Sequence, residues 1–382
     1  MIKCQHKKFN LPDSVSYLNC AYISPLLKSV EKIGHTAVSM KNMPYEISTE
    51  DFFAPVDELK KNFAKLIDVD EYERIALIPG VSYGIANVAK NIFIDRGENI
   101  VVASEQFPSN IYPWQQKIKE CGGELKTVFP AQSSRGKSWN ENLLNAINEK
   151  TKVVALSHVH WTDGTLFELK MIRKKCDEVN AYLVVDGSQS IGALPFSVKD
   201  IMPDALVCAG YKWLMGPYSL GLAYYSEKFD DGIPIEPCWI NKKGSEDFRS
   251  LANYTDNYKP MAMRYNVSES SNFILVPMLN AAIEQLLEWS QEAIQAYCAH
   301  ISYPALKELA EIGCLIEEKR YRANHLFGIR LNEKFDLEKI KRSMMKNHVH
   351  VSFRGNAIRV APHLYNTAGD FEQLVSCIKN PS

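Results

Sequence analysis

Lys212 lies in an apolar stretch of the sequence, VCAGYKWLMGP, between Tyr211 and Trp213. Burial disfavours the charged form of an amine, so a desolvated lysine has a lowered pKa and becomes a competent nucleophile for Schiff-base chemistry. The alternative is a surface lysine whose stem lies along apolar neighbours while its amine stays in water. Lys212 is therefore the strongest single candidate for chemistry in this chain.

Three other features precede Lys212. Asp186 ends the apolar run AYLVVD, 26 residues earlier, and a carboxylate after a buried strand needs a cation or several donors. It could pair with a protonated ligand nitrogen, or form an Asx-turn or helix cap. Phe107, before a proline, could stack on a flat cofactor or belong to the core. Residues 80–82 (GVS) could offer N–H groups and a hydroxyl to a phosphate, or only cap a helix.

Taken together, these features describe a site for pyridoxal 5′-phosphate (PLP), which needs a phosphate cradle, a stacking ring, a carboxylate for the ring nitrogen and a Schiff-base lysine. The chain has no GxGxxG after its first expected strands and no GxxxxGK[ST]. The missing glycine fingerprint argues against an α/β NAD enzyme.

The elements that must position these residues alternate in the middle of the chain. We expect strands at 74–79, 99–103, 125–129, 152–157, 181–186 and 205–208, with helices at 81–92, from 110, at 139–149 and at 168–179. Strands rich in Val, Ile and Leu without alternation indicate an α/β fold, with a mostly parallel sheet between helices. Ligands of such sheets bind beyond the carboxyl ends of the strands, where the candidate residues fall.

The pattern changes after about residue 260, with a helical region at 277–312 and strands at 325–330 and 357–360. We expect an N-terminal segment at 1–25 that packs near the active site, a large PLP-binding domain at 26–260 and a small α+β domain at 261–382. Residues 205–225 are as long as a membrane helix, but they hold Lys212, Pro217 and three glycines. A strand–turn–strand unit is the better interpretation.

The composition sets further limits. The 382 residues are 46% hydrophobic and 23% charged, and the net charge of −1 gives no reason to expect nucleic acid or an anionic membrane as partner. The nine cysteines are dispersed without a CxxC pair, which gives no support to a metal or dithiol site and fits a reducing cytoplasm. The first residues, MIKCQHKKFNLPDS, lack the apolar core of a signal peptide.

Six ordered motifs resemble the class V aminotransferase family of PLP enzymes, which includes cysteine desulfurases, selenocysteine lyases and kynureninase. They are YLNCAYISP (17–25), GVSYGIANVA (80–89), EQFPSNIYPWQ (105–115), VVDGSQSIGA (184–193), GYKWLMGP (210–217) and IRVAPHLYNT (358–367). The resemblance covers nearly the whole chain and implies fold type I. The Phe-Pro and Tyr-Lys pairs are similar to those of kynureninase.

The resemblance implies a role for each matched residue. Lys212 would form the internal aldimine and shuttle the Cα proton, and Asp186 would keep the pyridinium protonated. Arg359 would bind the substrate α-carboxylate through a bidentate fork. The remaining cofactor contacts would come from Phe107 (stacking), Gln189 (phenolic oxygen), and Val81, Ser82 and Tyr211 (phosphate). A homodimer would share its active sites, with the 268–270 region, here Ser268 of the partner subunit, completing the phosphate site.

The sequence departs from the desulfurase pattern in two places. Residues 346–359, KNHVHVSFRGNAIR, hold no cysteine where desulfurases carry a nucleophilic one, which argues against persulfide transfer. The segment HVHWTDGT (158–165), which contains Trp161, stands where desulfurases have an asparagine-containing segment. Trp161, His158 and His160 are candidates for shaping the substrate site, or else structural residues.

The expected function is that of a PLP enzyme acting on an amino acid through an external aldimine and a quinonoid. The sequence has no recognised group that selects between transamination, elimination, C–C cleavage and racemisation. An aminotransferase and a C–S or C–C lyase, similar to kynureninase or selenocysteine lyase, stay open. Two further readings are a desulfurase-like protein without the loop cysteine and a non-catalytic scaffold on this fold.

Overall fold

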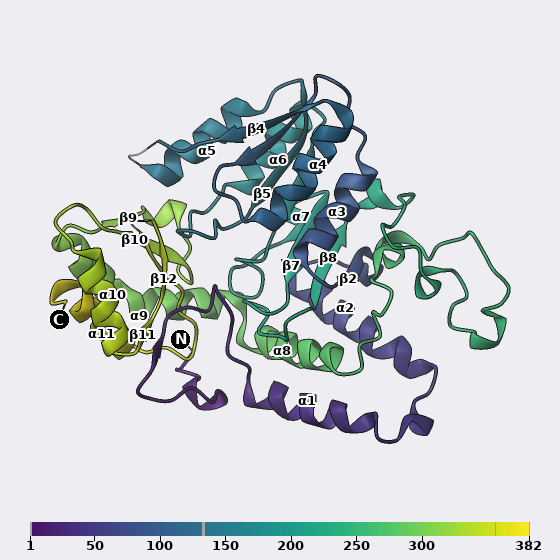
Figure 1. Cartoon of the computed structure of the whole chain (residues 1–382), viewed down its shortest axis with the longest axis horizontal. Helices are drawn as coiled ribbons and strands as arrows, with labels where there is room; N and C mark the ends of the chain where they lie inside the picture. Colours follow the sequence, from purple (N-terminus) through teal and green to yellow (C-terminus); the bar gives the residue numbers. More distant parts are fainter. Residues whose placement is uncertain (1, 132–133, 356, 382) are drawn as a thin grey trace.

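The computed structural model describes residues 2–131, 134–355 and 357–381. Its centre is a seven-stranded sheet in the order β2-β8-β7-β6-β5-β3-β4 (Figure 1). Strand β8 alone runs in the direction opposite to the other six strands of this sheet. The strands are β2 (Ile75–Ile78), β3 (Asn99–Ala103), β4 (Glu124–Val128), β5 (Thr151–Ser157), β6 (Tyr182–Asp186), β7 (Ala205–Ala209) and β8 (Gly221–Tyr225). The expected α/β fold with a mostly parallel sheet is confirmed.

Both faces of this sheet are buried. Neighbouring residues of a strand point to opposite faces, and in this sheet they belong to two different core clusters. Val101 and Val185 belong to the larger core cluster, whereas Val102 and Val184 belong to the smaller one. The smaller cluster is covered by α3 and α4, and the larger one by the remaining helices of this part. These helices are α1 (Lys28–Met40), α2 (Ala54–Leu66), α3 (Val81–Asn91), α4 (Tyr112–Cys121), α5 (Arg135–Ala146), α6 (Leu169–Glu178), α7 (Val198–Ile201) and α8 (Leu275–Trp289).

The C-terminal part forms a second layer structure beside the first (Figure 1). Its antiparallel sheet has the order β12-β13-β10-β9, and the N-terminal strand β1 pairs in parallel with β11. The strands are β1 (Ser16–Tyr17), β9 (Leu315–Ile316), β10 (Phe327–Arg330), β11 (Val349–His350), β12 (Ser352–Arg354) and β13 (Ala357–Val360), and the helices are α9 (Gln291–Glu311), α10 (Leu337–Lys346) and α11 (Ala368–Lys379).

The expected helical region 277–312 is two helices, separated at Ser290, which has a φ of +63°. Helix α8 packs against α1 and α2, whereas α9 packs against α11 and β9. The helices before and after Ser290 therefore pack against different parts of the protein. This change lies about 30 residues beyond the domain boundary that was expected near residue 260. The N-terminal segment lies near the candidate site, because the Ser24 N–H donates to the Tyr211 carbonyl.

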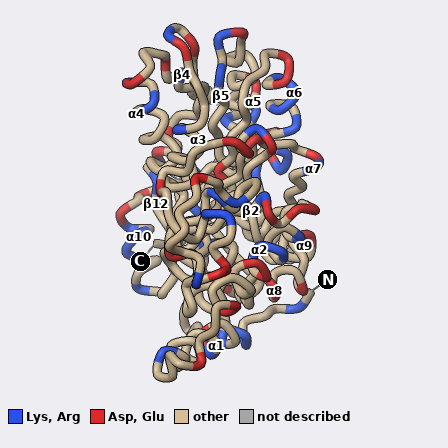
Figure 2. The backbone as a smooth tube through the Cα atoms, turned by 90° about the vertical axis from the view of Figure 1, so that its right-hand side faces the viewer, with Lys and Arg blue, Asp and Glu red and all other residues tan. Residues whose placement is uncertain are grey.

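The strand–turn–strand interpretation of residues 205–225 is confirmed, because Lys212 lies in the turn that joins β7 to β8. Within the described ranges, no helix is long and apolar enough to span a bilayer. Lys and Arg are interspersed with Asp and Glu over the view in Figure 2, in keeping with the small net charge.

Candidate active site

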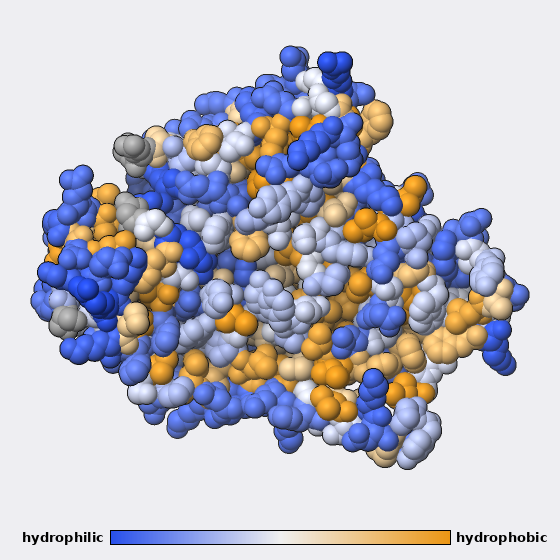
Figure 3. All heavy atoms as spheres, in the orientation of Figure 1, coloured by the Kyte–Doolittle hydropathy of each residue, from blue (hydrophilic) through white to orange (hydrophobic). Residues whose placement is uncertain are grey.

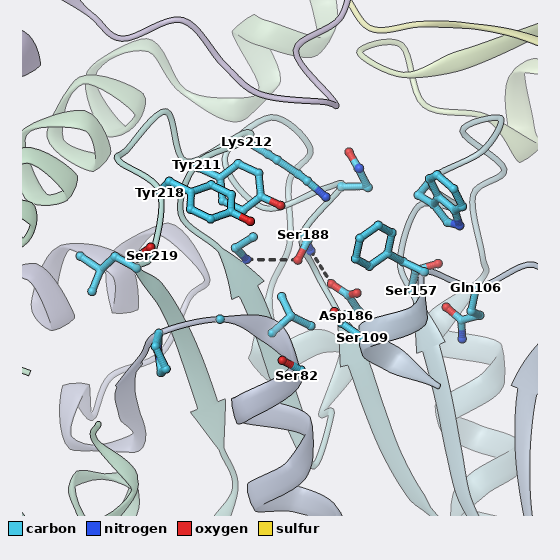
Figure 4. Close-up of a pocket in the computed structure, with 18 of the residues that line it drawn as sticks. Ser82, Gln106, Ser109, Ser157, Asp186, Ser188, Tyr211, Lys212, Tyr218 and Ser219 are labelled. Carbon is cyan, nitrogen blue, oxygen red and sulfur yellow. Dashed lines mark hydrogen bonds between the residues drawn. The ribbon is translucent and has the colours of Figure 1, made fainter. Parts of the chain in front are cut away.

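A cavity of about 370 Å³ opens at the carboxyl ends of β2, β3, β5, β6 and β7. Figure 4 shows residues from these strand ends and from the β7–β8 turn facing one space. The predicted residues that line it are Val81, Ser82, Phe107, Trp161, Asp186, Gln189, Tyr211 and Lys212. Residues far apart in the sequence meet here because parallel strands end at the same edge of the sheet.

The Lys212 amine lies in an apolar and aromatic setting inside this cavity. Its Nζ is 5.1 Å from the centre of the Phe107 ring and 5.6 Å from that of Tyr211. The side chain is buried, and burial lowers the pKa of Lys212 to about 8, with Asp186 opposing and Arg359 adding to the shift. The amine is thus much closer to its neutral, nucleophilic form at neutral pH than an exposed lysine would be.

The turn that carries Lys212 packs tightly against the loop after β6. Gly192, with a φ of +105°, lies so close that a Cβ atom there would be 2.2 Å from the Trp213 carbonyl oxygen. Only glycine tolerates both this conformation and this approach. The contact holds the loop of Asp186 and Gln189 against the turn of Lys212.

Asp186 is a buried carboxylate at the end of β6. Its Oδ1 accepts a hydrogen bond of 2.9 Å from the Ser188 N–H. Burial raises the pKa of Asp186, while the Ser188 hydrogen bonds and the Lys212 charge act in the opposite direction. Within the described part of the chain it forms no ion pair. A ligand that brings a positive charge to this carboxylate would offset its desolvation.

The N-terminus of α3 forms another wall of the cavity. No described residue accepts a hydrogen bond from the N–H of Val81 or Ser82, as is usual for the first residues of a helix. Gly80 leaves this side open, since a Cβ atom there would meet nothing within 4 Å. Tyr211 lies across the cavity with its ring 4.4 Å from that of Tyr218, and burial raises the pKa of Tyr211 to about 12. Its phenol therefore remains a hydrogen-bond donor.

Phe107 and Trp161 form an aromatic corner of the cavity. Phe107 keeps 38% of its surface exposed, and its ring meets that of Trp161 edge-on at 5.5 Å. Trp161 is fixed by a 2.6 Å hydrogen bond from its Nε1–H to the Glu105 carbonyl. A free aromatic face beside a lysine is suited to a flat ligand ring.

Ion pairs hold the Trp161 segment to both parts of the structure. Asp163, two residues beyond Trp161, binds Arg135 of α5 at 2.8 Å and Arg330 of β10. Arg135 also binds Glu105 at 2.8 Å. The segment that carries Trp161 is thus tied both to α5, beside the large sheet, and to β10 of the small sheet.

Gln189 has its amide engaged with the protein. Its Oε1 accepts from the Trp213 Nε1–H at 2.8 Å, and its Nε2 donates to the Ala21 carbonyl at 3.1 Å. The amide nitrogen carries two hydrogens, so one remains for a ligand.

Arg359 lies behind Trp161 and does not line the cavity. Its Nη1 donates to the Trp161 carbonyl at 2.8 Å and its Nη2 to the Ser352 hydroxyl at 3.1 Å. The side chain is 1% exposed, and burial together with Arg354 lowers the pKa of Arg359 to about 10. Its Nε is buried without a described partner.

Three other candidates lie outside the cavity lining. The His158 ring packs edge-on against Phe196 at 5.3 Å, and burial lowers the pKa of His158 to about 3. The two ring nitrogens of His160 are engaged, one with a Thr162 hydroxyl and one with a backbone carbonyl. The Ser268 N–H donates to Glu236 of its own chain at 3.0 Å. The structure therefore brings neither histidine nor Ser268 to the site of the same chain.

Sequence reasoning did not single out several lining residues, namely Gln106, Ser109, Ser157, Ser188, Tyr218 and Ser219. Ser188 could have been found from the sequence. An aspartate side chain often accepts a hydrogen bond from the backbone N–H two residues later, and Ser188 is at that position relative to Asp186. No sequence pattern pointed to Tyr218 or Ser219, because only the fold of the β7–β8 turn brings them to the cavity.

Comparison with known proteins agrees with this geometry. The profile of class-V aminotransferases matches residues 34–368. The chain belongs to the class-V aminotransferase family. An uncharacterized aminotransferase of Schizosaccharomyces pombe is 24% identical over 335 residues, which are 85% of this chain and 81% of that protein.

Two solved structures share the fold of this class-V family member. The apo cysteine desulfurase of Thermococcus onnurineus has a TM-score of 0.82 at 20% identity, over 98% of this chain and 97% of that one. A C-DES mutant with glycine covalently linked to its PLP cofactor has a TM-score of 0.84 at 17% identity, over 99% and 100%.

Proposed function

We propose that this protein is a PLP-dependent enzyme that acts on an amino acid through its α-amino group. The observation that carries the proposal is the pairing of a buried amine, Lys212, with a buried carboxylate, Asp186, across one cavity. Neither group has an ion-pair partner among the described residues, so a ligand that is electrophilic on one side and cationic on the other satisfies both. The C-DES structure, whose PLP carries a glycine, has the same fold.

The lining residues fit the parts of PLP. The free N–H groups of Val81 and Ser82, together with the Tyr211 phenol, suit its phosphate. Asp186 suits the ring nitrogen, Phe107 the ring face, and the spare N–H of Gln189 the phenolic oxygen. When bound, PLP supplies an electron sink for negative charge at the substrate Cα.

The chain's own residues then have separable tasks. The Lys212 amine, whose pKa of about 8 leaves it half neutral at that pH, would accept and return the Cα proton. The Asp186 carboxylate would hold the proton on the ring nitrogen. Arg359 would fix the substrate carboxylate, and the aromatic corner would exclude water from the reacting atoms.

The family chemistry divides between aminotransferase and lyase reactions, and we propose that this chain follows one of these. The 346–359 segment has no cysteine, and Cys314 and Cys377 lie buried in the C-terminal part. This observation favours a reaction that releases a small-molecule product over one that transfers sulfur to an acceptor protein.

A homodimer that completes the phosphate site is part of the proposal. Tyr45 and Tyr254 are 81% and 97% exposed, and Tyr254 belongs to the segment that projects between β8 and α8. Apolar residues are frequent beside this segment and over α1 and α8 in Figure 3. Covering by a second copy would bring Ser268 of the partner subunit to the open side at Gly80. A particle of one 43.3 kDa chain in sedimentation of the PLP-loaded protein would contradict this assembly.

The function is tested by adding single amino acids to the PLP-loaded protein and recording the visible spectrum of the cofactor. We expect a defined set of amino acids to change the spectrum, and product analysis for keto acid, alanine, sulfide or ammonia then identifies the reaction. A protein that stays colourless after incubation with PLP, or one whose spectrum no amino acid changes, would overturn the proposal.

The pH dependence of PLP uptake gives a second test. Because burial lowers the pKa of Lys212 from 10.5 to about 8, the reactive amine is the major form above about pH 8. We expect the rate of PLP uptake by the cofactor-free protein to rise about tenfold per unit below pH 8 and to level off above it. A rate that keeps rising towards pH 10.5 would show that Lys212 is not desolvated. Stopped-flow absorbance at several pH values measures this.

A further inference from the structure

Arg354 lies beside the aromatic corner of the cavity, although it does not line the cavity itself. Its guanidinium carbon is 4.9 Å from the centre of the Trp161 ring. The same Trp161 lines the cavity and contacts Phe107 edge-on at 5.5 Å. One tryptophan thus separates the expected position of the cofactor ring from a second arginine.

The strand register places Arg354 on the same side as Arg359. Ser352 of β12 pairs with Arg359 of β13, and the Ser352 hydroxyl accepts a hydrogen bond from Arg359. Arg354 is two residues beyond Ser352, so its side chain leaves the same face of the hairpin. Diagonal positions of this kind are about 7–8 Å apart between neighbouring strands.

The two guanidinium groups lack counter-charges. No described carboxylate forms an ion pair with Arg354 or Arg359. Among the described residues, Arg354 donates one hydrogen bond, from Nη1 to the Phe353 carbonyl at 2.8 Å, and its Nε is buried without a described partner. Burial lowers the pKa of Arg354, and the charge of Arg354 in turn lowers that of Arg359.

A single α-carboxylate neutralises only one of these charges. Resting on the proposed function, we propose that Arg354, stacked on Trp161, binds a second anionic group in the side chain of the substrate, so that the substrate class is amino acids with an acidic side chain. The planar guanidinium can stack on an aromatic ring while its edge binds a carboxylate with two hydrogen bonds. In this proposal Arg359 binds the α-carboxylate of the substrate, and Arg354 binds the carboxylate of its side chain.

A purely structural role for Arg354 would have a different signature. Stacking of a partly exposed arginine on tryptophan contributes about 0.5–1 kcal/mol whichever substrate is bound. Its loss would then affect all amino acids alike. A comparison of substrates whose side chains have equal size but differ in charge therefore distinguishes a substrate-binding role of Arg354 from a purely structural one.

The experiment measures kcat/KM of the PLP-loaded protein for each amino acid, and compares aspartate with asparagine and glutamate with glutamine. We expect the protein to prefer the acidic member of at least one pair. In Arg354→Gln, we expect the acidic-to-neutral ratio to fall about 10- to 100-fold, mainly through KM, because charge-assisted hydrogen bonds contribute about 1.5–3 kcal/mol. Arg354→Lys should recover part of the ratio, since it restores the charge without the fork.

The matched control is Arg342→Gln, which removes the same charge from an exposed position on α10. We expect it to leave the ratio unchanged. Equal losses for acidic and neutral substrates in Arg354→Gln, or a preference of the unchanged protein for neutral side chains, would overturn this inference. Both outcomes still require reacting amino acids, so they differ from failure of the proposed function, in which no amino acid reacts.

Discussion

Lys212→Ala is expected to abolish covalent attachment of PLP and to reduce turnover by about 10³-fold or more. The variant loses both the proposed nucleophile and the proposed base for the Cα proton, and general acid–base catalysis alone contributes about 10²–10⁴-fold. The proposed phosphate contacts at the start of α3 do not involve the lysine, so we expect PLP still to bind without a covalent bond. Absorbance after gel filtration and steady-state turnover measure the two effects.

Lys346→Ala is the matched control, because Lys346 is exposed at the end of α10, far from β7 in the sequence. It should retain the colour and the turnover of the unchanged protein. If Lys212→Ala kept a covalently bound cofactor, the amine would have to come from another lysine and the assignment would be wrong.

Asp186→Asn is expected to retain PLP but to lower turnover by about 10²–10³-fold. Asparagine keeps the shape and can still accept the 2.9 Å hydrogen bond from Ser188, but it cannot stabilise a proton on the ring nitrogen. The magnitude follows from the loss of one preorganised electrostatic partner in a buried site. Turnover, with bound cofactor quantified on the same sample, measures the effect.

Asp200→Asn, at an exposed position of α7, controls for loss of one negative charge. Asp186→Glu adds a test of position, because it keeps the charge and moves it by one methylene. Full activity of Asp186→Asn would show that the ring nitrogen needs no anionic partner and would leave the buried carboxylate unexplained.

Much of the central sheet could be predicted from sequence. The run NIVVA coincides with β3, and AYLVVD contains β6, because uninterrupted apolar β-branched residues are typical of strands buried on both faces. Helix α1 was not predicted, although Val30, Ile33, Gly34 and Ala37 recur at the helical spacing i, i+3, i+4 and i+7. It buries the small residues Gly34 and Ala37, and a Cβ atom on Gly34 would lie 2.8 Å from Met278 of α8.

The break between α8 and α9 also escaped prediction. Residues 277–312 read as one helical region, but Ser290 takes a left-handed conformation and its hydroxyl caps α9 by accepting from the Ala293 N–H. A serine is a weak signal for such a break, because it also occurs on exposed helix faces.

For the candidate site, strand ends were the useful guide. Asp186 and Lys212 meet because both follow strands of one sheet, and that rule needs only the order of the elements. The surroundings of Arg359 could not be derived in this way, since Arg359 comes from the small sheet and contacts the Trp161 carbonyl from outside the cavity lining. The placement of Arg354 on Trp161 likewise depends on how the two parts pack.

The most direct test is chemical trapping of the cofactor on the protein. The PLP-loaded protein is reduced with borohydride, digested, and its peptides are weighed by mass spectrometry. We predict loss of the visible colour and a reduced pyridoxyl phosphate group on the peptide that contains Lys212, and on no other. A label on a different lysine, or no label at all, would contradict the assignment of Lys212 as the residue that holds the cofactor.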